Sequence, residues 1–193
     1  HLWITDSSRG REDWVEIGLR TPPAPPFDRP DFYNNCGRYD SGVLTDIYGL
    51  DDLATSTPAV REALIEVYGG WIRTANVDGF RIDTVKHVEP EFWDVFAPAM
   101  RAVVASQSPG RRFIQFGEAY DVTHAQSDAY VRAPRLDSLL NFDFRGAVSR
   151  VFVSGQGTQL LTDELAARGV LRATDLGVGS AGLGADAAVV NFI

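Results

Sequence analysis

Apolar residues recur at intervals of three and four positions in two long segments, residues 58–75 and 90–105. This spacing puts the apolar side chains on one face of a helix. Thr57 is suited to cap the first helix, and Pro58 to its first position. The positions expected to face the core are Val60, Ala63, Leu64, Val67, Trp71 and Ile72, then Phe92, Trp93, Phe96, Met100 and Val103. The pattern therefore predicts two amphipathic helices.

Short apolar runs lie between and after these helices, at residues 77–82, 112–116, 138–142 and 187–193. Each run has the length of a buried strand, and two further helical patterns cover residues 145–152 and 158–168. Strands that alternate with helices favour parallel βαβ units in an α/β fold. Such folds carry their active sites beyond the carboxyl ends of the strands, so polar residues there are candidates for function.

The first part of the chain, residues 1–57, has no sustained helical or strand period. Five of the ten prolines lie between Pro22 and Pro30. Prolines at this density break regular structure, so we expect a loop-rich subdomain here. The domain boundary is predicted between residues 57 and 58, with the α/β domain over residues 58–193.

The net charge of the chain argues against some classes of binding partner. Acidic residues number 26 and basic residues 18, which gives a net charge of −8. Nucleic acids and anionic membrane surfaces bind basic clusters, which this sequence lacks, so neither is expected as a partner. No apolar run reaches the roughly 20 residues of a membrane span, and no membrane insertion is expected. A single cysteine, Cys36, excludes an intramolecular disulfide.

Charged residues gather around the end of the first predicted strand. Arg81 and Asp83 are two positions apart, so their side chains point to the same side of a strand. The pair alone is equally compatible with a salt bridge that only stabilises the strand. Lys86, the only lysine among 18 basic residues, and His87 follow directly and favour a functional site.

A second acidic residue, Glu118, follows the next predicted strand. It lies 35 residues after Asp83, about one βα unit, so the two carboxylates are expected on neighbouring strands at one edge. A partly buried acid has a raised pKa and can act as a general acid. Two carboxylates that converge on one cleft are the arrangement used in glycoside hydrolysis.

Three motifs resemble those of the α-amylase family of retaining glycoside hydrolases. Residues 78–87, DGFRIDTVKH, resemble the family's strand-four motif, and residues 116–119, FGEA, its strand-five motif. Residues 50–53, LDDL, resemble the short motif of its protruding second domain. The resemblance covers roughly residues 30–193. It implies part of a (β/α)8 TIM barrel, about strands four to seven, with residues 1–57 in the protruding subdomain.

The resemblance also implies a role for each site residue. Asp83 would be the nucleophile that forms a covalent glycosyl-enzyme, and Glu118 the general acid and base. Arg81 would keep Asp83 ionised and oriented, and Lys86 and His87 would contact sugar on the leaving-group side. The implied substrate is an α-1,4-glucan such as starch or a maltooligosaccharide.

Many members of the family bind a structural calcium ion, and no organic cofactor is implied. By motif, Asp52 and the backbone carbonyl of His87 match two of the calcium ligands. The second aspartate of the short motif is replaced by Ala54. Calcium is therefore an expectation of the resemblance that this sequence supports in part.

Several related functions stay open at this stage. A 4-α-glucanotransferase or an α-glucosidase of the same family would use the same machinery. A relative that serves binding or assembly without catalysis typically loses the acids, and here both are present. The apolar run at residues 187–193 predicts an interior piece of a longer protein, and the resemblance implies a third catalytic aspartate beyond residue 193. We expect the piece alone to be inactive.

Overall fold

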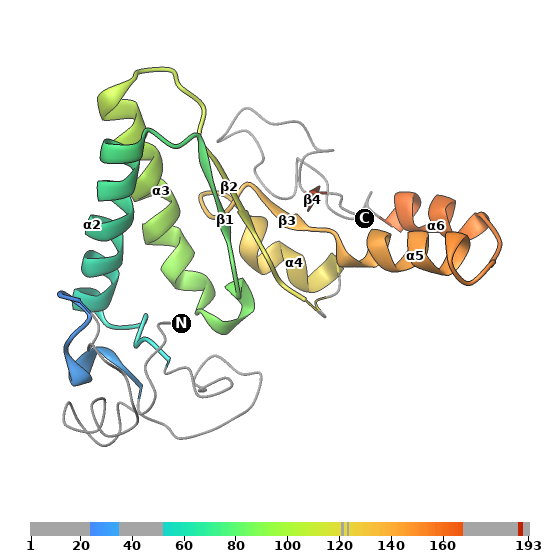
Figure 1. Cartoon of the computed structure of the whole chain (residues 1–193), viewed down its shortest axis with the longest axis horizontal. Helices are drawn as coiled ribbons and strands as arrows, with labels where there is room; N and C mark the ends of the chain where they lie inside the picture. Colours follow the sequence, from blue (N-terminus) through green and yellow to red (C-terminus); the bar gives the residue numbers. More distant parts are fainter. Residues whose placement is uncertain (1–23, 35–51, 121, 123, 168–188, 191–193) are drawn as a thin grey trace. The chain divides into compact units, whose positions relative to one another are not determined.

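The computed structural model describes residues 24–34, 52–120, 122, 124–167 and 189–190 of the 193-residue chain (Figure 1). The chain divides into two compact units. The first comprises His1–Gly70 with Lys86–Phe92, and the second comprises Trp71–Val85 with Trp93–Ile193. Within the described ranges, no helix is both long and apolar enough to cross a membrane.

The described part of the first unit is built around a small apolar cluster. Tyr33 and Leu53 form an isolated antiparallel bridge that joins the two described segments. The Tyr33 hydroxyl donates a hydrogen bond to the Phe27 carbonyl at 2.8 Å, so the ring is fixed among its neighbours. The buried members of the cluster are Phe27, Phe32, Tyr33, Leu53, Ala54 and Val60. Most of the predicted subdomain of residues 1–57 lies outside the described residues, and that domain assignment stays a prediction.

The two long helices form where the apolar spacing predicts them. Trp71 was expected to face the core but is 59% exposed, because the helix turns the adjacent Ile72 fully inward. Helix α2 is Pro58–Ala75, and Thr57 accepts the first helical hydrogen bonds through its carbonyl oxygen. Helix α3, Pro90–Gln107, extends two residues beyond its predicted end. Most of the predicted inward positions of α3 are buried, but Val104 is buried rather than Val103. The error at this position is a shift of one residue along the helix face.

The second unit contains a sheet of parallel strands in the order β1-β2-β3-β4 (Figure 1). The strands are β1 Gly79–Ile82, β2 Ile114–Gly117, β3 Ser138–Leu140 and β4 Val189–Val190. Each pairs in parallel with the next strand along the chain. The predicted alternation of strands and helices in a parallel sheet is confirmed, although β1, β2 and β3 are each shorter than their apolar runs.

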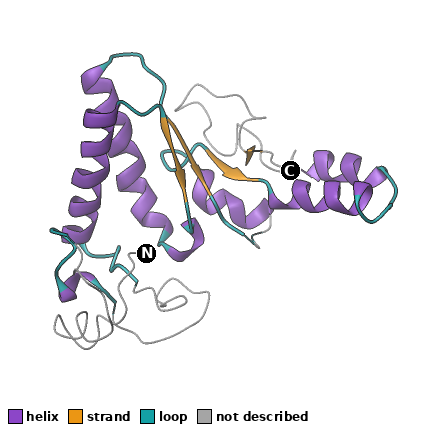
Figure 2. Cartoon of the chain, viewed as in Figure 1, coloured by secondary structure: helices purple, strands orange, loops and turns teal. Residues whose placement is uncertain are grey.

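The remaining helices differ from the prediction in two places (Figure 2). Helix α4, His124–Val131, was not predicted, because its sequence HAQSDAYV has no apolar stripe at helical spacing. The predicted strand 138–142 ends at Leu140, since the Asn141 side chain accepts a hydrogen bond from the Phe144 N–H and caps helix α5, Phe142–Phe152. Helix α6, Gln159–Ala167, follows α5 and packs against it.

A buried polar network joins α3 to β2 and to the start of β3. The Asp137 side chain is only 2% exposed and accepts hydrogen bonds at 2.7 Å from the Arg101 guanidinium and from the Gln115 backbone N–H. Arg101 also donates to the carbonyls of Pro134 and Arg135. Because a buried charge is costly without its partners, this network restricts how α3 lies against the strands.

We expect Asp137→Ala to lower the free energy of unfolding by about 3–5 kcal/mol, because it leaves the Arg101 charge and the Gln115 N–H without their buried acceptor. Urea unfolding of the full-length protein would measure this. The control is Asp163→Ala, which removes an exposed carboxylate bonded only to Gln159 on its own helix and should cost less than about 0.5 kcal/mol. Equal losses in the two variants would contradict the role of the network.

Candidate active site

The register of β1 and β2 brings the two predicted acids together. Ile82 pairs with Gly117, and the next residue of each strand is an acid, Asp83 and Glu118. The Glu118 N–H donates to the Ile82 carbonyl at 2.7 Å, so the pairing continues to the end of both strands. Both carboxyl groups therefore lie at the same edge of the sheet, as the sequence predicted.

Arg81 contacts both acids. Its Nη2 lies 2.7 Å from Oε2 of Glu118, and its Nη1 lies 3.7 Å from Oδ1 of Asp83. The guanidinium bonds directly to Glu118 and interacts with Asp83 at longer range. The sequence predicted only the Arg81–Asp83 interaction, because these residues are two positions apart on one strand. The contact with Glu118 joins two different strands and has no such local signal. The structure adds Glu118 as the closer partner.

The environment moves the pKa values of the two acids apart. A hydrogen bond with Asp83 is the main cause that raises the pKa of Glu118, and burial and the charge of Asp83 add to it, against the opposing effect of Arg81. The same hydrogen bond is the main cause that lowers the pKa of Asp83, helped by the charge of Arg81 and the Thr84 backbone N–H. Glu118 is therefore the group of the pair that keeps a proton to higher pH, and Asp83 is the group that ionises first.

The opposite pKa shifts of the two acids are suited to acid and base chemistry. Two carboxyl groups whose pKa values are pushed apart supply one proton donor and one anion at the same pH. The Glu118 side chain is 26% exposed and that of Asp83 is 65% exposed, so both can be approached from solvent. The site can protonate one atom of a substrate while a carboxylate attacks or stabilises another.

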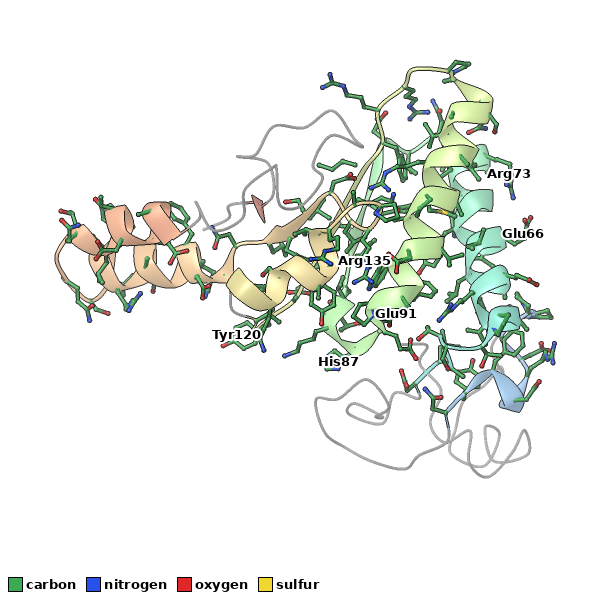
Figure 3. The ribbon with its side chains drawn as sticks, turned by 180° about the vertical axis from the view of Figure 1, so that it is seen from behind. Glu66, Arg73, His87, Glu91, Tyr120 and Arg135 are labelled. Atoms are coloured by element: carbon green, nitrogen blue, oxygen red, sulfur yellow. The ribbon has the colours of Figure 1, made fainter. Side chains whose placement is uncertain are left out.

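An aromatic pair that sequence reasoning missed lies at the same edge of the sheet. Tyr120 follows β2 and is 65% exposed (Figure 3). Its ring packs edge to face against Phe142, which follows β3, with 5.1 Å between the ring centroids. The sequence has an aromatic residue just past the end of β2 and of β3. Residue 142 was predicted to lie within a strand, so the pair was not recognised. An exposed ring two residues after Glu118 can stack on the apolar face of a ligand.

Lys86 and His87 lie on a short 3-10 helix, η3, Val85–His87, directly after the site. His87 is buried and Lys86 is half-buried. Both residues belong to the first unit, whereas Arg81, Asp83 and Glu118 belong to the second. Their predicted contact with sugar stays a prediction.

The predicted calcium ligands, Asp52 and the His87 carbonyl, both belong to the first unit. Asp52 is 5% exposed, and its Oδ2 accepts a hydrogen bond from Asn34 Nδ2 at 2.5 Å. Calcium takes six to eight oxygen ligands. No group of three or more His, Cys, Asp or Glu side chains suited to a metal is found within the described part of the chain. The two predicted ligands offer oxygen atoms, the kind that calcium prefers, and their part in a calcium site stays a prediction.

Several known proteins are similar to this chain in sequence. Residues 38–168 match the family model described as "Alpha amylase, catalytic domain". An α-amylase of Streptomyces lividans is 40% identical over 134 residues, and a cyclomaltodextrinase of Thermoanaerobacter pseudethanolicus is 32% identical over 145 residues. These alignments cover 67% and 72% of this chain, and the chain spans only 14% and 21% of the two relatives.

Solved structures resemble the chain in fold. An Anoxybacillus α-amylase matches with a TM-score of 0.61 at 24% identity, over 84% of this chain and 39% of its own. An α-amylase from Malbranchea cinnamomea matches with a TM-score of 0.60 at 22% identity, over 78% of this chain and 32% of its own. These likenesses confirm the predicted fold class, because the parallel strands and their helices are part of a (β/α)8 barrel.

Titration of the two carboxyl groups would test whether their pKa values are shifted in opposite directions. We expect two apparent pKa values for the pair, one below the usual range of aspartate and one above that of glutamate. In Asp83→Asn the pKa of Glu118 should fall, because a neighbouring negative charge is removed and the asparagine amide can donate to an ionised Glu118. NMR titration of labelled carboxyl carbons would measure the values. Asp163→Asn should change neither pKa. An unchanged pKa of Glu118 in Asp83→Asn would contradict the coupling of the two acids.

Proposed function

Because the chain belongs to the α-amylase family, we propose that it carries the active site of a retaining glycoside hydrolase that cleaves α-1,4-glucosidic bonds in starch or maltooligosaccharides. One observation carries the proposal. Asp83, Glu118 and Arg81 meet at the ends of two adjacent parallel strands, with the pKa of Glu118 raised and the pKa of Asp83 lowered.

In the proposed reaction, Glu118 gives its proton to the glycosidic oxygen as the bond from that oxygen to the anomeric carbon breaks. Asp83 attacks the anomeric carbon from the other side and forms a covalent glycosyl ester. Glu118, now ionised, takes a proton from a water molecule that attacks the same carbon. This step releases Asp83 and returns the proton to Glu118, so the configuration at the anomeric carbon is inverted twice and thus retained.

The closeness of the two carboxyl groups supports retention over inversion. An inverting enzyme needs the carboxyl groups about 6.5–9.5 Å apart to hold a water between base and sugar, and a retaining enzyme needs about 5–5.5 Å. Here each carboxyl group is the main cause of the other's pKa shift, so the two lie close to one another, which favours the shorter, retaining spacing.

The pH dependence follows from the two protonation states. Activity requires an ionised Asp83, so it falls as the pH drops through the lowered pKa of that group. It also requires a protonated Glu118, so it falls as the pH rises through the raised pKa of Glu118. Arg81 would stabilise the anion of Asp83, and Lys86 and His87 would bind sugar on the leaving-group side. Asp52 and the His87 carbonyl would be two ligands of a structural calcium ion.

A second candidate is transfer of the glycosyl group to another sugar in place of water. A cyclomaltodextrinase is among the relatives, and a cyclomaltodextrin glucanotransferase is among the structures of similar fold. The covalent intermediate is the same in both reactions, and only the acceptor differs. Chromatography of the products from a single maltooligosaccharide distinguishes them, since products longer than the substrate indicate transfer.

We expect Asp83→Asn in the full-length protein to lower kcat/KM for maltooligosaccharides by about 10⁴-fold or more, because an amide cannot form the glycosyl ester. Release of reducing sugar would measure the loss, and NMR of the wild-type product should show the α-anomer first. The control is Asp143→Asn, on helix α5, which should stay within about twofold of the wild type. Near-normal turnover by Asp83→Asn would contradict the assignment of Asp83 as the nucleophile. A product that appears first as the β-anomer would contradict the retaining mechanism.

We expect Tyr120→Ala to raise KM for maltooligosaccharides by about 5- to 20-fold, with a smaller effect on kcat. Stacking of an aromatic ring on a sugar face contributes roughly 1–2 kcal/mol to binding, and Tyr120 is the exposed ring nearest in sequence to Glu118. The matched variant is Tyr120→Phe, which keeps the ring and the contact with Phe142 and should bind nearly as well as the wild type. Initial-rate kinetics with substrates of different length would separate the two effects, and an unchanged KM in Tyr120→Ala would contradict a sugar contact.

A further inference from the structure

The chain departs from regular strand pairing directly after Asp83. In a regular parallel pair, the N–H of a residue donates to one of the two residues that flank its partner, and its carbonyl accepts from the other. Glu118 donates to the carbonyl of Ile82, but its own carbonyl accepts from the N–H of Val85 at 3.0 Å instead of from residue 84. One extra residue therefore lies between these two bonds. This is the pattern of a β-bulge, and it holds Asp83 and Thr84 outside the regular ladder.

Thr84 makes the bulge at an energetic cost. Its φ of 53° lies in the left-handed region, which a β-branched residue rarely adopts. Such a conformation persists only where the surrounding contacts stabilise it. The bond from Val85 to the Glu118 carbonyl is one such contact, because it returns the chain to the end of β2 immediately after the bulge.

The side chain of Val85 supplies a second contact. Val85 is fully buried, and it fills the space in which a side chain at position 117 would lie. A Cβ added to Gly117 would meet Val85 Cγ2 at 2.5 Å, Leu139 Cδ2 at 2.8 Å and Leu136 Cδ1 at 3.0 Å. Val85 is thus packed tightly on the backbone of the residue that precedes Glu118. Its N–H and its side chain both fix the same short stretch of β2.

From this geometry we propose that Val85 is a positioning residue for Glu118, which sets where the proton donor lies relative to the glycosidic oxygen. The inference rests on the proposed function, because it assigns the effect of Val85 to the general acid. Val85 does not touch the substrate in this account. It acts through the backbone of Gly117 and Glu118, and removing its methyl groups would free that backbone to shift. A general acid displaced by a fraction of an ångström transfers its proton less well.

The test compares two substrates that differ in their need for a proton. A maltooligosaccharide has a poor leaving group that Glu118 must protonate, whereas α-maltosyl fluoride loses fluoride without a general acid. In Val85→Ala we expect kcat/KM to fall by about tenfold or more for the maltooligosaccharide and by less than about threefold for the fluoride. The parameter kcat/KM reports only the steps up to formation of the glycosyl-enzyme, so the later role of Glu118 as a base does not enter.

Val104→Ala is the matched control. Val104 lies on α3 and is also almost fully buried, so its truncation removes the same two methyl groups from a core position. Both variants should lower Tm, but Val104→Ala should leave kcat/KM within about twofold for both substrates. Gly117→Ala tightens the same contact from the other side and should show the same substrate dependence as Val85→Ala. It provides a second test if Val85→Ala does not fold.

The outcomes separate this inference from the proposed function. Equal losses on both substrates, or a profile for Val85→Ala that matches Val104→Ala, would overturn the positioning role and leave the proposed function intact. Failure of the wild-type protein to cleave either substrate, or normal activity of Asp83→Asn, would overturn the proposed function, and the positioning role would fall with it.

Discussion

The parallel pairing of β1 with β2 is the constraint on which the site depends. Ile82 and Gly117 are in register, so the residue that follows each strand is carried to the same point at the sheet edge. The two acids are 35 positions apart in sequence, and no local interaction would bring them together. The backbone bonds of the ladder do so without any contribution from the acids themselves. The carboxyl groups can therefore keep a mutual repulsion that an isolated pair would relieve by moving apart.

Arg81 helps to make this closeness stable. Its positively charged guanidinium lies 2.7 Å from Glu118 and 3.7 Å from Asp83. It favours the ionised form of both groups, and the hydrogen bond between the acids raises the pKa of Glu118 and lowers the pKa of Asp83. The asymmetry has a structural source, since Asp83 also interacts with the Thr84 backbone N–H and Glu118 is the less exposed of the two. The opposite pKa shifts of the two acids thus come from their surroundings.

The sequence was most informative where structure is decided locally. The apolar spacing of residues 58–75 predicted α2 with its observed bounds, because a helix is formed by contacts within a few positions. It was least informative at α4, whose sequence carries no apolar stripe, and at residue 142, where an apolar run continues past the strand. At the latter position the Asn141 side chain ends the strand by capping the next helix. One polar side chain thus outweighed the apolar pattern.

By itself the sequence determined the chemical groups of the site and their order along the chain. Motifs 78–87 and 116–119 supplied an arginine, a lysine and two acids at strand ends, and predicted a parallel α/β fold. The tertiary structure alone decided the contact of Arg81 with Glu118, the opposite pKa shifts of the two acids, and the bulge that Val85 closes. These properties depend on distances between residues far apart in the chain. Such distances are set by strand register and side-chain packing, and neither has a local signature in the sequence.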